Sequence, residues 1–263
     1  MSNSDASSTA VASSAAAAAA AVNASTKVSG ASRRTAGPVP KLPKKQLTAG
    51  EKNYLIAYNA LSFAAWFSIL VVVCWDLYAS DFRYKHLYDK YGWPLIIVQS
   101  FAILEVIHAD RGLVQSDVFT TLAQVFSRLF VTWGVLFTVD HPDHYMHWSF
   151  AMMTISWSLT ESIRYSYYAL NLIGNAPYAL LWLRYTLFMI LYPTGVAGEL
   201  FQIILSLPHL EEGPAALYYF TQALLLAYPL AFYRLYGHMF SQRGKVLKRA
   251  IDKANAEKAA KAQ

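Results

Sequence analysis

The stretch YLIAYNALSFAAWFSILVVVCWDLY, from Tyr54 to Tyr78, decides the fold class, and Asp76 is its only charged residue. A helix needs about 20 mainly apolar residues to cross the roughly 30 Å hydrocarbon core of a bilayer, and this stretch is long enough. The whole chain agrees, because 56% of its residues are apolar and only 14% are charged. Soluble domains carry about a quarter charged residues. The sequence therefore predicts a membrane protein.

Five more apolar segments follow the first along the chain. They are approximately Trp93–Ala109, Val118–Val139, His147–Leu170, Tyr178–Leu207 and Pro214–Phe240. Together the six segments predict an all-α membrane protein, with a bundle of six transmembrane helices over residues 51–240. Tyrosine and tryptophan gather near several segment ends, as they do in the aromatic belts of membrane proteins.

Both ends of the chain are polar and basic. Residues 1–50 are rich in alanine, serine, threonine and lysine and contain no large apolar cluster, so we expect a disordered tail. Of the 22 lysines and arginines, seven lie between residues 27 and 52 and seven between 243 and 261. We therefore expect residues 241–263 to form a basic tail beside the membrane, rather than part of a nucleic-acid-binding face.

The positions of the basic residues predict the orientation of the bundle. Six crossings place both termini on one side, and the positive-inside rule makes that side cytoplasmic. The connections at 140–146 and 208–213 contain no lysine or arginine, as expected for the opposite side. The first connection disagrees, because it carries Arg83, Lys85 and Lys90.

Five charged residues lie well inside the apolar segments: Glu105, Arg128, Glu161, Arg184 and Glu199. Each would cost about 2.5–3.5 kcal/mol at a lipid-facing helix centre. We therefore expect these side chains to face one another inside the bundle or to line a cavity. Such groups either hold the helices together or belong to a reaction centre.

Spacing along the helices refines this expectation. Glu161 and Arg164 are three residues apart, which is close enough for a local ion pair on one helix. Gln124 and Arg128 are four residues apart and share a helical face. We expect this second face to meet another helix of the bundle.

The stretch LYPTGVAGE, residues 191–199, places a phenol and a carboxylate inside an apolar segment. Tyr192 and Glu199 are seven residues apart, which is about two helical turns, so both side chains lie on one face. A phenol and a carboxylate form a proton donor and acceptor pair that burial and neighbouring charges can tune. The spacing therefore favours an enzymatic site.

Helix-breaking residues lie between this tyrosine and glutamate. Pro193 lacks a backbone N–H and pushes against the carbonyl of Met189, while Gly195 and Gly198 leave room to bend. Prolines and glycines also occur in membrane helices for packing alone. We expect a kink here that changes the distance between the two reactive side chains.

Four stretches carry a resemblance to a known family: LEVIHADRGLV, QVFSRLFVTW, SWSLTESIRYSYYAL and WLRYTLFMILYPTGVAGEL, which together cover about Leu104–Leu200. In their order and spacing they resemble the 3-hydroxyacyl-CoA dehydratases of the endoplasmic reticulum, once called protein tyrosine phosphatase-like proteins. The resemblance implies that residues 51–240 form a multi-pass dehydratase domain. It also implies the third step of very-long-chain fatty acid elongation, with other elongation-cycle enzymes as partners.

The family pattern Y-P-x-G-x-x-x-E falls on Tyr192 and Glu199, which the resemblance implies are the catalytic residues. Residues that support activity in the family fall on Glu105, Gln124, Arg128, Arg184 and Gly195. The implied substrate is a (3R)-3-hydroxyacyl-CoA and the implied product is its trans-2-enoyl-CoA. Our preferred hypothesis is that Glu199 protonates the departing hydroxyl and Tyr192 takes the carbon-bound proton, and the reverse assignment stays open.

Other classes of protein fit the residues less well. A cysteine phosphatase needs an arginine five residues beyond its thiolate, whereas the next arginine after Cys74 is Arg83. A noncatalytic scaffold for elongation enzymes is the chief alternative. A small-molecule transporter is the other, because buried charges and kinked helices also mark transport pathways.

The motif HPDHYMH places His141, His144 and His147 at intervals of three, with Asp143 between them. Such residues can bind a metal in the manner of membrane desaturases and hydroxylases, but a di-iron site needs several more histidines. The remaining histidines form no further motif. We therefore expect no metal and no cofactor.

Overall fold

The computed structural model describes residues 46–139 and 141–261, and the regular secondary structure in these ranges is helical. The predicted disordered tail, residues 1–50, lies mostly outside the described residues. Helix α2 (Ala49–Ala79) begins directly after Thr48. The Thr48 side chain accepts a hydrogen bond from the Glu51 N–H, and the Glu51 carboxylate accepts one from the Thr48 N–H, so a capping box fixes this helix start.

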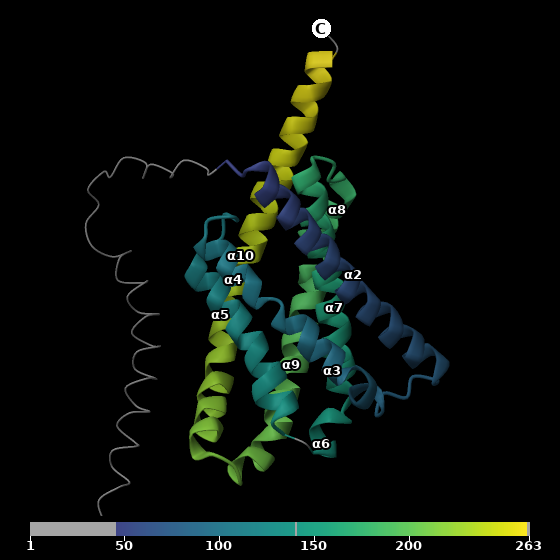
Figure 1. Cartoon of the computed structure of the whole chain (residues 1–263), viewed down its shortest axis with the longest axis vertical. Helices are drawn as coiled ribbons and strands as arrows, with labels where there is room; N and C mark the ends of the chain where they lie inside the picture. Colours follow the sequence, from purple (N-terminus) through teal and green to yellow (C-terminus); the bar gives the residue numbers. More distant parts are fainter. Residues whose placement is uncertain (1–45, 140, 262–263) are drawn as a thin grey trace, which may run out of the picture. The chain divides into compact units, whose positions relative to one another are not determined.

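The predicted apolar segments all form helices (Figure 1). After α2 come α3 (Leu87–Ser100), α4 (Ile103–Asp110), α5 (Val118–Leu129), the π-helix η1 (Phe130–Phe137), α6 (Pro142–Tyr145), α7 (Trp148–Ile173), α8 (Tyr178–Arg184), α9 (Phe188–Glu211) and α10 (Ala215–Lys261). Among the residues that the structure describes, five stretches are long and apolar enough to cross a membrane: Ala49–Ala79, Leu87–Asp110, Val118–Phe137, Phe188–Glu211 and Ala215–Asp252.

The remaining predicted span, α7, is long but polar. It has 26 residues, of which twelve are buried, and it packs most extensively against α2 and α9. Glu161, Thr154 and most of its serines are buried against these neighbouring helices. A helix packed among other helices does not need an apolar surface. Length and hydropathy do not identify α7 as a membrane span.

Two predicted segments are divided in the structure. The second segment is split into α3 and α4 at Phe101 and Ala102, and the fifth is split into α8 and α9 at residues 185–187. The sixth continues beyond its predicted end at Phe240, because α10 includes the basic residues that follow.

The connections alternate between the two ends of the helices (Figure 1). The α7–α8 connection and the start of α2 lie at one end, and α6 and the α9–α10 connection lie at the other. The first connection lies at the same end as α6, as the predicted topology requires. There Lys90 and His86 pair with Asp76 at 3.0 and 3.1 Å. An acidic partner thus offsets part of the positive charge that disagreed with the orientation.

Helices α7 and α9 approach each other closely at Gly198. A Cβ atom on Gly198 would lie 2.7 Å from the Cβ of Met153 and 3.0 Å from its Cα and N atoms. Real Cβ contacts are essentially never as short as 2.7 Å, so only glycine fits without a shift of the backbone. Small residues commonly permit such contacts between membrane helices.

We expect Gly198→Ala to destabilise the protein by about 1–3 kcal/mol, because the added methyl group overpacks the contact with Met153. Gly237→Ala on α10 is the matched control, since nothing lies within 4 Å of its added Cβ. Denaturant unfolding in one detergent measures both. Equal stability of the two variants would show that the close approach of α7 and α9 is wrong.

Candidate active site

Glu199 lies at the junction of three helices, and its side chain is buried. The indole Nε1–H of Trp157 on α7 donates to Oε1 of Glu199 at 2.8 Å. The hydroxyl of Tyr228 on α10 donates to Oε2 at 2.5 Å. Both carboxylate oxygens are thus held by side chains from neighbouring helices, which fixes the orientation of the group. Neither Trp157 nor Tyr228 is singled out by a sequence motif.

Tyr192 and Glu199 both lie on α9, and both side chains face α10. Its ring stacks on Phe232 with 5.2 Å between centroids and 7° between planes, and on Tyr236 with 6.1 Å and 14°. Tyr228, Phe232 and Tyr236 are spaced four residues apart, so they form one stripe along α10. Because this stripe contacts both residues of the pair, the prediction that Tyr192 and Glu199 share a face of α9 is confirmed.

The side chain of Tyr192 is less enclosed than that of Glu199. Within residues 46–139 and 141–261, no hydrogen bond to its hydroxyl is found, and the side chain is only partly buried. Glu199 and Arg128 both lie close enough to Tyr192 to interact with it electrostatically. The two groups therefore differ, since Glu199 is held on both oxygens, whereas the described residues offer no hydrogen-bond partner to the phenol.

Helix α9 continues through Pro193. The helical segment is interrupted earlier, at residues 185–187, which separate α8 from α9. The carbonyl of Met189, which Pro193 leaves without its helical donor, accepts a hydrogen bond from the Tyr236 hydroxyl at 3.0 Å. The Thr194 hydroxyl donates to the carbonyl of Ile190 at 2.9 Å. A residue of α10 therefore provides the hydrogen bond that the proline removes from the helix. This residue, Tyr236, also stacks on Tyr192.

The buried charges pair across three helices. Arg128 on α5 donates to Glu161 on α7, and Arg164 on α7 donates to Glu105 on α4. The Tyr165 hydroxyl donates to Glu105 at 2.5 Å. Arg164 Nε also lies 2.9 Å from Glu161 Oε2, although this contact lacks hydrogen-bond alignment. The expected pairing inside the bundle is confirmed for these residues, including the local pair of Glu161 with Arg164.

Arg128 connects this charge network to the Tyr192–Glu199 pair. Its guanidinium carbon lies 5.0 Å from the centroid of the Trp157 ring, which is within the range of a cation–π contact. The same indole donates its N–H to Glu199. Arg128 and Glu199 therefore contact the same indole ring.

Arg184 lies at the end of α8 and lines a cavity. It donates to the hydroxyl of Tyr168 at 2.8 Å, and its guanidinium lies 4.4 Å from the centroid of that ring. The cavity has a volume of about 260 Å³, and its lining includes Arg164 on α7 and Leu191 and Phe188 on α9. The alternative expectation, that a buried charge lines a cavity, is the one that holds for Arg184.

The other two residues expected to support activity have different surroundings. Gln124 is exposed on α5, and no side-chain contact brings it to Glu199 in the part of the chain that the structure describes. Gly195 is buried, and a Cβ atom there would lie 3.6 Å from both Ser156 and Trp157. Gly195 thus faces the indole that holds Glu199.

Comparison with known families identifies the family of the chain. Residues 99–249 match the family described as protein tyrosine phosphatase-like protein, PTPLA. The chain belongs to the PTPLA family. The matched residues contain Glu105, Arg128, Tyr192 and Glu199, together with the Tyr228 that holds the carboxylate. No solved structure matches the chain.

Three PTPLA-type relatives show how much of the chain is shared. The Arabidopsis thaliana protein named very-long-chain (3R)-3-hydroxyacyl-CoA dehydratase PASTICCINO 2 is 37% identical over 225 residues, covering 80% of this chain and 98% of the relative. The Caenorhabditis elegans dehydratase hpo-8 is 38% identical, with coverages of 74% and 95%. The Homo sapiens very-long-chain (3R)-3-hydroxyacyl-CoA dehydratase 2 is 36% identical, with coverages of 74% and 80%.

Proposed function

We propose that this chain dehydrates very-long-chain (3R)-3-hydroxyacyl-CoA to trans-2-enoyl-CoA, the third step of the fatty acid elongation cycle. The names of its relatives support the reaction. The observation that carries the proposal is the arrangement of α9, where a carboxylate held on both oxygens and a phenol face the same helix.

The reaction needs two proton transfers. One group removes a proton from C2, the electron pair of that C–H bond forms the C2=C3 double bond, and the C3–O bond breaks. A second group protonates the departing hydroxyl, which leaves as water. Tyr192 and Glu199 divide these two roles, and either direction of transfer uses the same pair. No cofactor enters this balance.

The cavity beside α9 supports a place for the reacting end of the substrate. It is lined by Arg164 and Arg184, whose guanidinium groups can donate to a thioester oxygen or to a phosphate. Leu191, which precedes Tyr192 in the sequence, is one of the apolar residues that line the same cavity. The thioester enters here in our proposal, while the acyl chain runs along the apolar helix faces.

The membrane arrangement is part of the proposal. Helix α7 is the sixth span, both termini are cytoplasmic, and the protein lies in the endoplasmic reticulum membrane beside other elongation-cycle enzymes. The alternation of connections in Figure 1 supports an even number of crossings. A glycosylation acceptor placed in the η1–α7 connection will be modified in microsomes, whereas one added after Gln263 will not. The opposite pattern would invert the topology.

The reaction itself is tested with the purified chain and 3-hydroxyacyl-CoA substrates of graded acyl length. We expect conversion to the trans-2-enoyl-CoA. Chromatography of the substrate and product thioesters measures this conversion. Protein that folds but converts none of these substrates would favour the scaffold. Substrate flux into sealed vesicles without chemical change would favour the transporter.

Tyr228 is expected to position Glu199. Tyr228→Phe removes the hydroxyl that donates to Oε2, and we expect kcat to fall about 10- to 100-fold with little change in KM. Tyr233→Phe is the matched control, because Tyr233 lies on the same helix and is 80% exposed. Unchanged kcat in Tyr228→Phe would show that Trp157 alone holds the carboxylate.

A further inference from the structure

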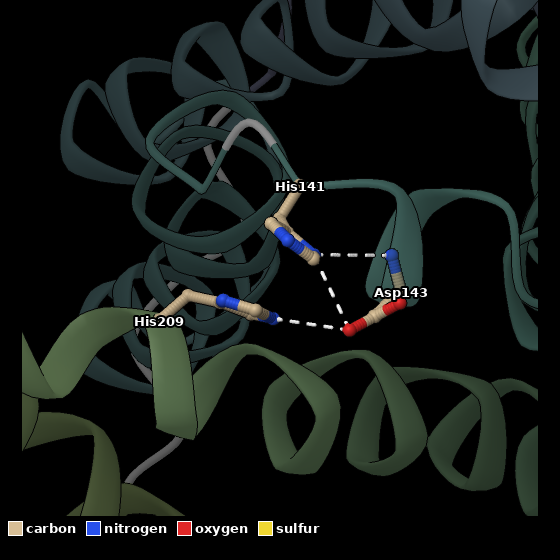
Figure 2. A group of neighbouring side chains, drawn as sticks. All are labelled: His141, Asp143 and His209. Atoms are coloured by element: carbon tan, nitrogen blue, oxygen red, sulfur yellow. Dashed lines mark hydrogen bonds and ion pairs between the residues drawn. The ribbon is translucent and has the colours of Figure 1, made fainter.

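Two histidines and an aspartate meet outside the site described above (Figure 2). His141 and Asp143 lie in the connection between η1 and α7, and His209 lies in the last turn of α9. Figure 2 shows both imidazole rings turned toward the same carboxylate. One ligand atom from each residue lies within 4.8 Å of the other two. The chain thus brings together residues that are more than 60 positions apart.

The distances in this cluster suit a shared ion better than direct hydrogen bonds. Nδ1 of His141 lies 3.4 Å from Oδ2 of Asp143, and Nε2 of His209 lies 3.8 Å from the same oxygen. A charge-assisted hydrogen bond would be about 2.7–2.9 Å long. Two atoms bound tetrahedrally to one zinc ion at about 2.0–2.1 Å are roughly 3.4 Å apart.

The hydrogen bond made by His141 is compatible with metal binding. The backbone N–H of Asp143 donates to Nδ1 of His141 at 3.3 Å, which is longer than most hydrogen bonds of this kind. Because a ring nitrogen has one in-plane lone pair, binding of a metal ion through Nδ1 would replace this weak contact.

The two histidines are also stacked, with 3.8 Å between ring centroids and 23° between planes. Two imidazoles that bind one ion through their in-plane nitrogens point away from it in different directions, so metal binding would turn the stacked rings apart. His147, which is part of the same sequence motif, is used differently. Its Nδ1 caps α7 by accepting from the Ser149 N–H.

We propose that His141, Asp143 and His209 bind one divalent transition-metal ion, with zinc as the best fit. Two imidazole nitrogens and a carboxylate oxygen are typical zinc ligands, and a water molecule completes a tetrahedral set. The carboxylate is largely exposed, so the ion enters from solvent and the side chains can turn to close the remaining gap. The site ties the η1–α7 connection to the end of α9, the helix that carries Glu199.

The test uses the full-length protein, without an affinity tag, after metals have been removed by a chelator. We expect one equivalent of Zn²⁺ or Co²⁺ to bind with a Kd at or below about 1 μM. The Co²⁺ form will show the visible absorption of a tetrahedral site, and Zn²⁺ will raise the Tm. None of these readouts depends on dehydratase activity.

His209→Gln and Asp143→Asn are expected to weaken metal binding about tenfold or more. His86→Gln is the matched control, because His86 lies at the same end of the helices and pairs with Asp76. Each variant is first compared with the unchanged protein in its metal-free Tm, so that a folding defect is recognised. The proposal is wrong if the unchanged protein binds no metal at micromolar concentration, or if His209→Gln and His86→Gln bind it equally well.

Discussion

Glu199→Gln is expected to lower kcat/KM for dehydration by about 10²- to 10⁴-fold, the range that a general acid or base contributes. Glutamine keeps the size of the side chain and can still accept the indole N–H of Trp157, but it neither takes nor gives a proton at neutral pH. The loss should lie in kcat, because the carboxylate acts on the reacting atoms rather than on the bulk of the substrate. The rate of enoyl-CoA formation by the purified variant, compared with the unchanged protein, measures this loss.

Glu211→Gln is the matched control for this substitution. Glu211 is the last residue of the same helix and is exposed, so its variant should match the unchanged protein in both kcat and Tm. Glu199→Gln should also remain folded, because Trp157 and Tyr228 still surround the side chain. Retention of full activity by a folded Glu199→Gln protein would remove Glu199 from the chemistry.

Loss of Arg128 is expected to lower the stability of the protein strongly. Arg128→Met removes the arginine that donates to Glu161, a carboxylate that is only 2% exposed. Removing one partner of a buried ion pair lowers the free energy of unfolding by about 3–5 kcal/mol, because the other charge stays buried without its partner. We expect a loss at the lower end of this range, because Arg164 still contacts Glu161. Denaturant unfolding in detergent measures the change in the free energy of unfolding.

A double variant distinguishes two causes of this loss of stability, the unpaired charge of Glu161 and the missing packing of the arginine side chain. Adding Glu161→Gln to Arg128→Met removes the unpaired charge, so the double variant should recover much of the lost stability. Arg111→Met, at an exposed position just after α4, should change stability little. A double variant that is less stable than Arg128→Met would mean that the ion pair is not what holds α5 to α7.

Several features of the fold follow from the sequence because they depend on local pattern. The apolar segments predict the helices, and the seven-residue spacing of Tyr192 and Glu199 predicts their shared face. The cost of an isolated charge in lipid predicts that Arg128 and Glu161 find partners. None of these expectations needs knowledge of which helices are neighbours.

Features that depend on the register between helices could not be predicted. Tyr228 holds Glu199 only because α9 and α10 pack antiparallel with one particular alignment. The repeat of Tyr228, Phe232 and Tyr236 every four residues is a signal that was present in the sequence, although it does not say which helix it meets. His209 likewise reaches His141 only in three dimensions.

The break in the fifth segment shows how tertiary contacts override a local signal. Pro193 is the strongest helix breaker in that segment, yet α9 continues through it, and the Tyr236 hydroxyl donates to the carbonyl of Met189 that the proline leaves unpaired. The interruption at residues 185–187 contains neither proline nor glycine. A sequence pattern therefore does not locate it.

In the proposed reaction, Tyr192 and Glu199 act as one unit. The most direct measurement is kcat/KM for the unchanged protein, Tyr192→Phe, Glu199→Gln and the double variant, all on one 3-hydroxyacyl-CoA substrate. We predict that each single variant loses at least about 100-fold and that the double variant is no slower than the slower single one, as for residues that work together. Losses that multiply in the double variant, or full activity in Tyr192→Phe, would contradict the claim.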